Sequence, residues 1–169
     1  LRKEPGVKLY TNNVLIKEYS TDLLPDWLNF VDGVVDSENL PLNVSRETVQ
    51  NNRLMRQLSK VVKKRVLRTI TRMNDETFAK FWKEYGRVLK EGMAVDPAAK
   101  DEIVPLLKFV SSKSDGKLTS LKDYVGRMPE DQEKIYYVLG SDVSSVAFSP
   151  HLDPFKAKGY EVLYFVDPI

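Results

Sequence analysis

The chain has 169 residues, of which 42% are hydrophobic and 30% are charged, so it has enough apolar material for one domain or two small ones. No stretch approaches the roughly 20 apolar residues of a membrane-spanning helix, and no membrane partner is expected. There is no cysteine and only one histidine, His151. Disulfides, thiolate metal sites and a cysteine nucleophile are therefore excluded, and a catalytic triad or zinc site would depend on one imidazole.

Positive charge is concentrated in one segment. The net charge is only +2, a sum that indicates no preference for nucleic acid. Residues 46–72 nevertheless contain nine basic residues and one acidic residue, Glu47. The basic residues are Arg46, Arg53, Arg56, Lys60, Lys63, Lys64, Arg65, Arg68 and Arg72. This run indicates either the solvated face of a long helix or a docking surface for phosphates or acidic partners.

The first third of the chain predicts a strand, a short helix, a loop and a long helix. Residues 8–16 have strand composition, and residues 22–35 place apolar side chains at helical spacing, with Pro25 near the start. Residues 36–45 are rich in turn formers. Ser45 is a candidate N-cap for an amphipathic helix that continues to Met73.

Helices dominate the middle of the chain. The aromatic-rich segment 75–90 predicts a second helix, with Gly92 just beyond its end, and its aromatic face indicates a core rather than a cofactor site. Asp96 and Pro97 resemble an N-cap and a first helical residue, and Pro105 should kink or end the helix that follows.

The last third predicts a small α/β unit. Residues 111–119 read as a linker, and Ser120 as the N-cap of a short helix through Arg127. Residues 135–140 and 161–166 read as parallel strands that flank helical or irregular material, which is typical of a βαβ unit.

The expected fold class is α/β, with two small αβα modules joined by a helical segment that includes one long helix. We expect part of a larger αβα module with a catalytic loop and the long helix over residues 1–72. A helical connector over 73–110 and a small βαβ module over 111–169 should follow. Because the chain lacks an initiator Met and its first residues lack a signal-peptide core, we also expect it to be a piece of a longer protein.

Few residues predict chemistry by themselves. No glycine-rich phosphate loop occurs, so the chain should not hold a nucleotide alone. The acidic pair Asp22 and Asp26 and the acidic residues at 130, 131 and 133 are more typical of solvated surface than of a metal site, and no metal is expected. His151 has no ligand partner at a useful spacing.

Arg46 is the strongest candidate residue. It falls in the first turn of the predicted long helix, where backbone N–H groups and the helix dipole favour anions, and Gln50 lies one turn further on the same face. Leu40 and Leu42 precede it in the loop. Arg46 could meet an anionic oxygen supplied by another domain, or it could pair with a local carboxylate.

Four motifs resemble the heat shock protein 90 (Hsp90) chaperone family, and they occur in the family's order. They are residues 33–50 (GVVDSENLPLNVSRETVQ), 81–86 (FWKEYG), 118–128 (LTSLKDYVGRM) and 132–137 (QEKIYY). The first resembles the signature of the family's middle domain. The resemblance covers nearly all of the chain after Val7.

The resemblance implies a homodimeric, ATP-dependent chaperone that binds ATP, with Mg, in a separate N-terminal domain. It implies that Arg46 reaches the γ-phosphate, that Gln50 assists, and that Leu40 and Leu42 help the domains dock. It also implies client proteins and cochaperones as partners, and no hydrolysis by this piece alone.

Some details of the sequence depart from the family or concern the compartment. Residues 43–50 look most like endoplasmin, the family's endoplasmic-reticulum paralogue, so the reticulum lumen is expected, with cytoplasm or an organelle as the alternative. Asn43 begins an N-glycosylation sequon inside the catalytic loop. Asp153 and Pro154 fall where the family continues a helix, so we expect that helix to start later or to break.

A competing hypothesis belongs to another class. The helix over residues 53–72 could make the chain a nucleic-acid-binding module, whose affinity would fall steeply with salt. A purely structural connector is the third possibility.

Overall fold

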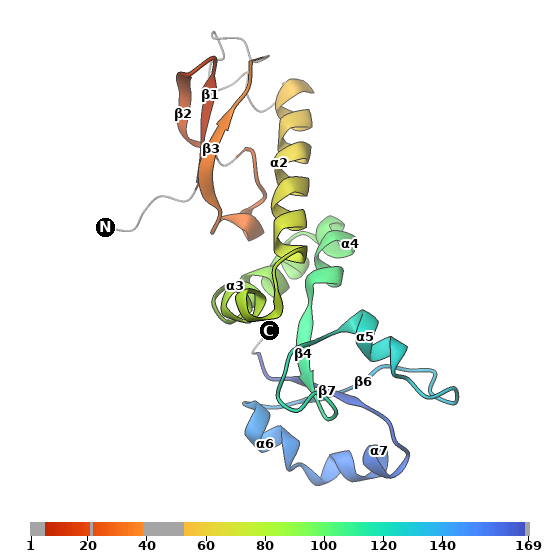
Figure 1. Cartoon of the computed structure of the whole chain (residues 1–169). Coiled ribbons are helices and arrows are strands. Elements are labelled where there is room, and N and C mark those ends of the chain that lie inside the picture. Colours follow the sequence, from red (N-terminus) through yellow and green to blue (C-terminus); the bar gives the residue numbers. More distant parts are fainter. Residues whose placement is uncertain (1–5, 21, 39–52, 168–169) are drawn as a thin grey trace. The chain divides into compact units, whose positions relative to one another are not determined.

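The computed structural model describes residues 6–20, 22–38 and 53–167 (Figure 1). The chain divides into two compact units, residues 1–92 and 93–169. The boundary lies within the segment expected to be a helical connector. Each unit combines a β-sheet with helices, which confirms the α/β class. Within the described ranges, no helix has the length and apolar character needed to cross a bilayer.

The first unit contains a three-stranded sheet of order β2-β1-β3. Strands β1 (Gly6–Thr11) and β2 (Val14–Ser20) pair antiparallel, and β3 (Asp32–Asp36) pairs parallel with β1. The single strand expected over residues 8–16 is therefore wrong. Asn12 and Asn13 adopt positive φ angles of 49° and 64°, the conformation of a tight hairpin turn, and they reverse the chain between β1 and β2.

The helix expected over residues 22–35 is also wrong. A 3₁₀ helix, η1, spans only Asp26–Leu28 and buries Trp27 and Leu28. The chain then becomes extended, and the residues from Asp32 to Asp36 pair in register with Gly6 to Tyr10 of β1. The apolar side chains at helical spacing are thus buried by a compact turn and a strand, because pairing with a distant segment outweighs local periodicity.

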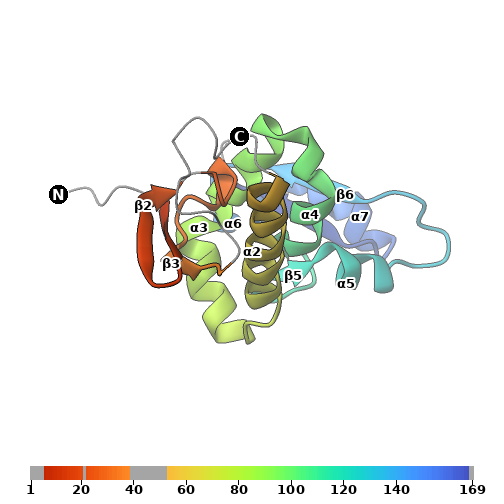
Figure 2. The ribbon, with the colours of Figure 1, turned by 90° about the horizontal axis from the view of Figure 1, so that it is seen from above.

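Helix α2 (Arg53–Thr71) lies alongside this sheet in both views (Figures 1 and 2). Its Met55 joins Val7, Leu9 and Leu23 in a buried cluster, against which Leu58 packs. The amphipathic pattern expected for this helix is confirmed over its described residues, while its expected start at Ser45 lies outside them.

Helix α3 (Asp75–Val95) completes the first unit and continues into the second. Its start is capped by Asn74, whose side-chain oxygen accepts a hydrogen bond from the Thr77 N–H at 2.8 Å. The expected end of this helix before Gly92 is wrong. The helix continues to Val95, and Gly92 is buried within it. Phe78 and Leu89 on its aromatic face are buried, as the core interpretation predicts, whereas Tyr85 is exposed and stacks on the ring of Phe30 with centroids 4.4 Å apart.

Short helices open the second unit. Pro97 starts the 3₁₀ helix η2 (Pro97–Ala99) in the expected position, although Asp96 makes no side-chain cap. Helix α4 (Lys100–Ile103) follows, and the chain tightens into the 3₁₀ helix η3 (Val104–Leu106) at Pro105. Pro105 thus ends the α-helical geometry, as expected.

The second unit contains a four-stranded sheet of order β5-β4-β7-β6. Strands β6 (Tyr136–Leu139) and β7 (Val162–Phe165) pair parallel, as predicted. Strands β4 (Lys108–Ser111) and β5 (Thr119–Ser120) were not anticipated, and β4 pairs antiparallel with both β5 and β7.

Helices α6 (Val143–Ala147) and α7 (Asp153–Ala157) cover one face of this sheet (Figure 1). Their core includes Val146 and Leu152 packed on Val162 and Tyr164. The 3₁₀ helix η4 (Pro150–Leu152) precedes α7, and Pro154 occupies the first turn of α7, where its missing N–H removes no helical hydrogen bond. Of the two expected outcomes for this helix, a later start or a break, the structure shows a start at Asp153.

Candidate functional site

The candidate residues Arg46, Gln50, Leu40 and Leu42 lie outside the described residues. The structure therefore does not place their side chains relative to one another. It does describe both elements that flank the segment, β3 on one side and α2 on the other. Each of these two elements is attached to the first unit by contacts between described residues.

The end of β3, which precedes residues 39–52, is hydrogen-bonded to β1 and to the hairpin turn. The Ser37 N–H donates to the Tyr10 carbonyl at 3.0 Å, and the Thr11 hydroxyl donates to the Ser37 carbonyl at 2.6 Å. The Asp36 carboxylate accepts a hydrogen bond from the Asn13 N–H at 3.1 Å. Thr11 is fully buried, so its hydrogen bond belongs to the packed sheet, whereas the bond between Asn13 and Asp36 is exposed.

Helix α2, which follows residues 39–52, packs on the same unit. Met55 is buried on the sheet, two residues after the first described residue of α2. One turn later, the Ser59 hydroxyl donates to the Leu23 carbonyl at 2.9 Å. Both flanks of residues 39–52 therefore belong to one core, which contains Val7, Leu9 and Leu23.

The other candidates named from the sequence include an ion-paired aspartate, a hydrogen-bonded aspartate and an exposed histidine. Asp22 pairs with Lys17 at 2.6 Å, and Asp131 accepts a hydrogen bond from the Tyr160 hydroxyl at 2.8 Å. That bond raises the pKa of Tyr160. His151 is exposed on η4. Within the ranges that the structure describes, no three His, Asp or Glu side chains gather as a metal site would require.

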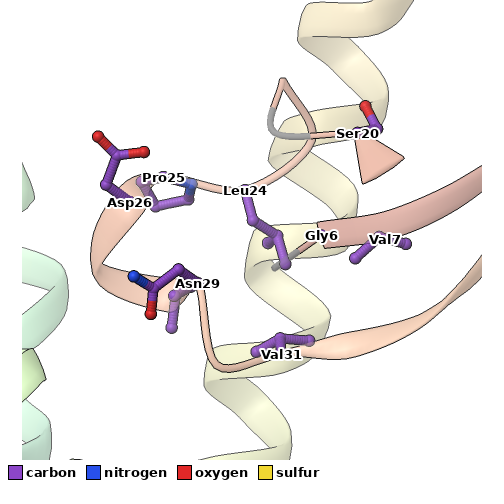
Figure 3. Close-up of a pocket in the computed structure, with 9 residues that line it drawn as sticks. Gly6, Val7, Ser20, Leu24, Pro25, Asp26, Asn29 and Val31 are labelled. Carbon is purple, nitrogen blue, oxygen red and sulfur yellow. The ribbon is translucent and has the colours of Figure 1, made fainter. Parts of the chain in front are cut away.

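A small hollow lies between β1, β2 and the η1 turn (Figure 3). It measures about 130 Å³ and is lined mainly by apolar residues, among them Val7, Leu24 and Val31. The Ser20 hydroxyl on its wall is buried and has no hydrogen-bond partner among the described residues. Asp26 is the one titratable side chain among the described residues that line the hollow, and these residues offer no acid–base pair.

Sequence reasoning missed a buried polar cluster in the second unit. Glu161 is 2% exposed, and its carboxylate receives two hydrogen bonds from Arg127, at 2.9 and 2.8 Å. Ser111 also donates to this carboxylate, and Arg127 donates to the Thr119 hydroxyl at 2.7 Å. The cluster joins β4, β5, the end of α5 (Leu121–Gly126) and the start of β7.

The protonation of Glu161 follows from these contacts. Burial by itself would raise its pKa, but the hydrogen bonds from Arg127 and Ser111 outweigh that effect and leave the pKa below its ordinary value. The hydrogen bond to Glu161 raises the pKa of Arg127 in turn. Both groups are therefore charged near neutral pH and neutralise each other, which makes this a structural ion pair.

Tyr124 extends the cluster. Its ring is fully buried, and its hydroxyl donates to the Glu161 carbonyl at 2.7 Å while accepting from the Tyr136 N–H at 3.0 Å. Ser120 caps α5 as predicted, accepting from the Asp123 N–H at 3.1 Å. The motif at residues 118–128 thus positions side chains that hold the second sheet together.

Comparison with known proteins identifies the family. A family described as "Hsp90 protein" matches residues 2–169. The chain belongs to the Hsp90 family. It is 47% identical over 171 residues to "Chaperone protein HtpG" of Myxococcus xanthus (strain DK1622), an alignment that covers 99% of this chain and 26% of that protein.

Other relatives give the same result. The chain is 48% identical over 172 residues to the HtpG chaperone of Desulfitobacterium hafniense (strain Y51), covering 99% of this chain and 28% of the relative. It is 44% identical over 171 residues to that of Geobacter sulfurreducens (strain ATCC 51573 / DSM 12127 / PCA), covering 99% and 26%. The chain therefore spans about a quarter of the length of the curated relatives that it matches.

Two expectations are corrected by these relatives. The likeness to endoplasmin is not supported, since the similar proteins are HtpG chaperones. The endoplasmic-reticulum lumen is wrong as the compartment, because these relatives come from bacteria, which have no reticulum. An eight-residue motif distinguishes relatives less well than identity over 171 residues does.

Proposed function

We propose that the chain is the middle part of an ATP-dependent chaperone and that Arg46 brings positive charge to the γ-phosphate of ATP held by a separate N-terminal domain. Gln50 would assist Arg46, and Leu40 and Leu42 would help the two domains dock. The observation that carries the proposal is the match of residues 2–169 to the Hsp90 family, with 47% identity to a protein named as a chaperone.

The described flanks support a role that depends on domain closure. Residues 39–52 connect β3 with α2, and both elements are attached to one buried core. Strand β3 and helix α2 therefore move with that core when the domain moves. A cation delivered by closure would stabilise the charge that develops on the phosphoryl oxygens, and it would couple hydrolysis to the conformational step.

The nucleotide itself would be held elsewhere. The sequence has no glycine-rich phosphate loop. The residues proposed to face the γ-phosphate, Arg46 and Gln50, supply a cation and an amide but no carboxylate for Mg. Mg would therefore bind with ATP in the separate domain, where it would neutralise phosphate charge.

The partners of the whole protein follow from the same proposal. They are the N-terminal ATPase domain, client proteins and possible cochaperones, within a full-length homodimer. The relatives' names support the chaperone role, since all three of those described above are named as chaperones. We propose the cytoplasm as the compartment, the alternative already considered from the sequence.

The test replaces Arg46 by Ala in a protein that joins this chain to its ATPase domain. Loss of one transition-state contact should lower kcat for ATP by about 100-fold, and the Kd for ATP should stay within about twofold. Arg87→Ala is the matched control, because Arg87 is an exposed arginine of α3 that pairs with Glu91 at 2.7 Å. The control should leave kcat unchanged.

Two outcomes would contradict the proposal. Unchanged kcat in Arg46→Ala would remove the catalytic role. An equal loss of kcat in both variants would show that the loss of any arginine charge, rather than the position of Arg46, causes the effect.

A further inference from the structure

A row of positive side chains follows α2. The cationic row consists of five residues spaced four apart, Arg56, Lys60, Lys64, Arg68 and Arg72, and all five are exposed. In an α-helix, four residues rise about 6 Å, so the row extends over about 24 Å. Arg72 follows directly after the last residue of α2, and its N–H still donates to the Arg68 carbonyl at 3.2 Å.

The cationic row faces away from the core. At about 100° per residue, the middle of the row, Lys64, lies on the side opposite to Val62 and Met55. Met55 and Ile70 are the buried residues of α2, and Leu58 packs against the cluster that holds Met55. Each step of four residues turns by about 40°, so Arg56 and Arg72 lie about 80° to either side of Lys64, and the exposed row winds around the solvent-facing side of the helix.

The cationic row is not neutralised within the described part of the chain. Helix α2 contains no Asp or Glu, and no side chain of the row forms an ion pair with a described residue. Helix α3 differs, because Lys80 pairs with Glu76 at 2.7 Å and Arg87 with Glu91 at 2.7 Å. Like charges four residues apart on a helix repel one another, so a polyanion bound along the row would reduce this repulsion.

We propose that the cationic row binds the phosphate backbone of nucleic acid without reading its sequence. Phosphates need only a line of cations, and the energy comes from the release of counterions. An acidic protein would instead need an apolar or aromatic anchor at the centre of the contact. Helix α2 contains no aromatic residue, and its exposed large apolar side chains are the aliphatic Leu54 and Val61.

Recognition of a particular base sequence in DNA would need side chains that contact the bases. Asn or Gln reads adenine, Arg or Lys can read guanine, and single strands are held by stacked aromatics. Gln57 is the one amide side chain of α2. We assign the contacts of the row to phosphates, which its lysines and the guanidinium groups of Arg56, Arg68 and Arg72 can all bind. A preference for one duplex sequence would instead indicate contacts with guanine.

The test measures binding of the full chain to a labelled 20-base-pair DNA duplex by fluorescence anisotropy at 50 and 200 mM salt. Five phosphate contacts predict a slope of about −4.5 in log K against log salt, hence a loss of affinity of about 500-fold between the two conditions. Two duplexes of different sequence should bind within about twofold of each other.

Two triple variants separate the row from general charge. Lys60→Gln with Lys64→Gln and Arg68→Gln removes three charges from the row, which predicts a slope of about −1.8 and a salt effect of about 12-fold. Lys80→Gln with Lys83→Gln and Arg87→Gln removes the same residue types from α3 and should keep the wild-type slope. Circular dichroism melts check that both variants are folded.

Several results would overturn the proposal. They are no binding at 50 mM salt, equal weakening by both triple variants, or a strong preference for one duplex sequence. Displacement of the duplex by polyglutamate of equal charge and at equal concentration would instead indicate an acidic protein partner. ATP turnover plays no part in these measurements, so this inference and the proposed function can fail separately.

Discussion

Arg127 of the second unit and the arginines of the cationic row in the first unit are used in opposite ways. In the second unit, Arg127 makes two hydrogen bonds to the buried carboxylate of Glu161 and a third to Thr119. In the first unit, the arginines of the cationic row are exposed, and none pairs with a described acid. The charge of Arg127 is therefore used within the fold, whereas the charge of the row stays available to a partner. This comparison is the reason that we propose binding by the first unit, whereas the Arg127–Glu161 pair supports the fold of the second.

The largest expected effect comes from breaking the buried pair. Glu161→Gln leaves the Arg127 guanidinium without its counter-charge and should lower the free energy of unfolding of the second unit by about 2 to 3 kcal/mol. Amide hydrogen exchange in β4 and β7 should accelerate. Fluorescence of Trp27 and Trp82, both in the first unit, should report unchanged unfolding there. Unchanged exchange in β4 and β7 would show that the pair does not stabilise the sheet.

The same carboxylate predicts a smaller, pH-dependent effect. The pKa of Glu161 is lowered in the folded chain from an ordinary value of 4.5, so its stabilising contribution is complete above about pH 4.5 and is lost as the pH falls through the folded pKa. The difference in unfolding free energy between wild type and Glu161→Gln should therefore shrink below about pH 4.5. A constant difference from pH 7 to pH 3 would contradict the lowered pKa.

The smallest effects sharpen the contrast between α2 and α3. Lys80→Gln removes an exposed pair with Glu76 and should lower stability by about 0.3 to 0.5 kcal/mol. Lys64→Gln removes two like-charge contacts, with Lys60 and Arg68, and should raise stability by a similar amount. Urea denaturation followed by tryptophan fluorescence would measure both. A loss of stability in Lys64→Gln would mean that the row is neutralised within the unit.

Elements defined by local signals could be predicted from the sequence. The periodicity of α2 and α3, the cap at Ser120 and the strand composition of β6 and β7 all follow from residues close together in the chain. The hairpin at Asn12 and Asn13 was missed although its signal is local, because two asparagines between apolar runs were read as part of one strand.

Elements defined by distant partners could not be predicted. Strand β3 exists because it pairs with β1, about 26 residues earlier, although its sequence continues a helical pattern. Glu161 receives hydrogen bonds from Arg127 and Ser111, which lie 34 and 50 residues away. No spacing rule connects such residues. The role proposed for Arg46 likewise came from resemblance to a family, since its residue type and position also fit a local ion pair.

The most direct test of the central claim is a single-turnover measurement of γ-phosphate cleavage, with ATP already bound, in a protein that joins this chain to its ATPase domain. We expect Arg46→Ala to cleave bound ATP about 100-fold more slowly than wild type, because the transition state loses a positive charge. A cleavage rate equal to that of wild type would contradict the account.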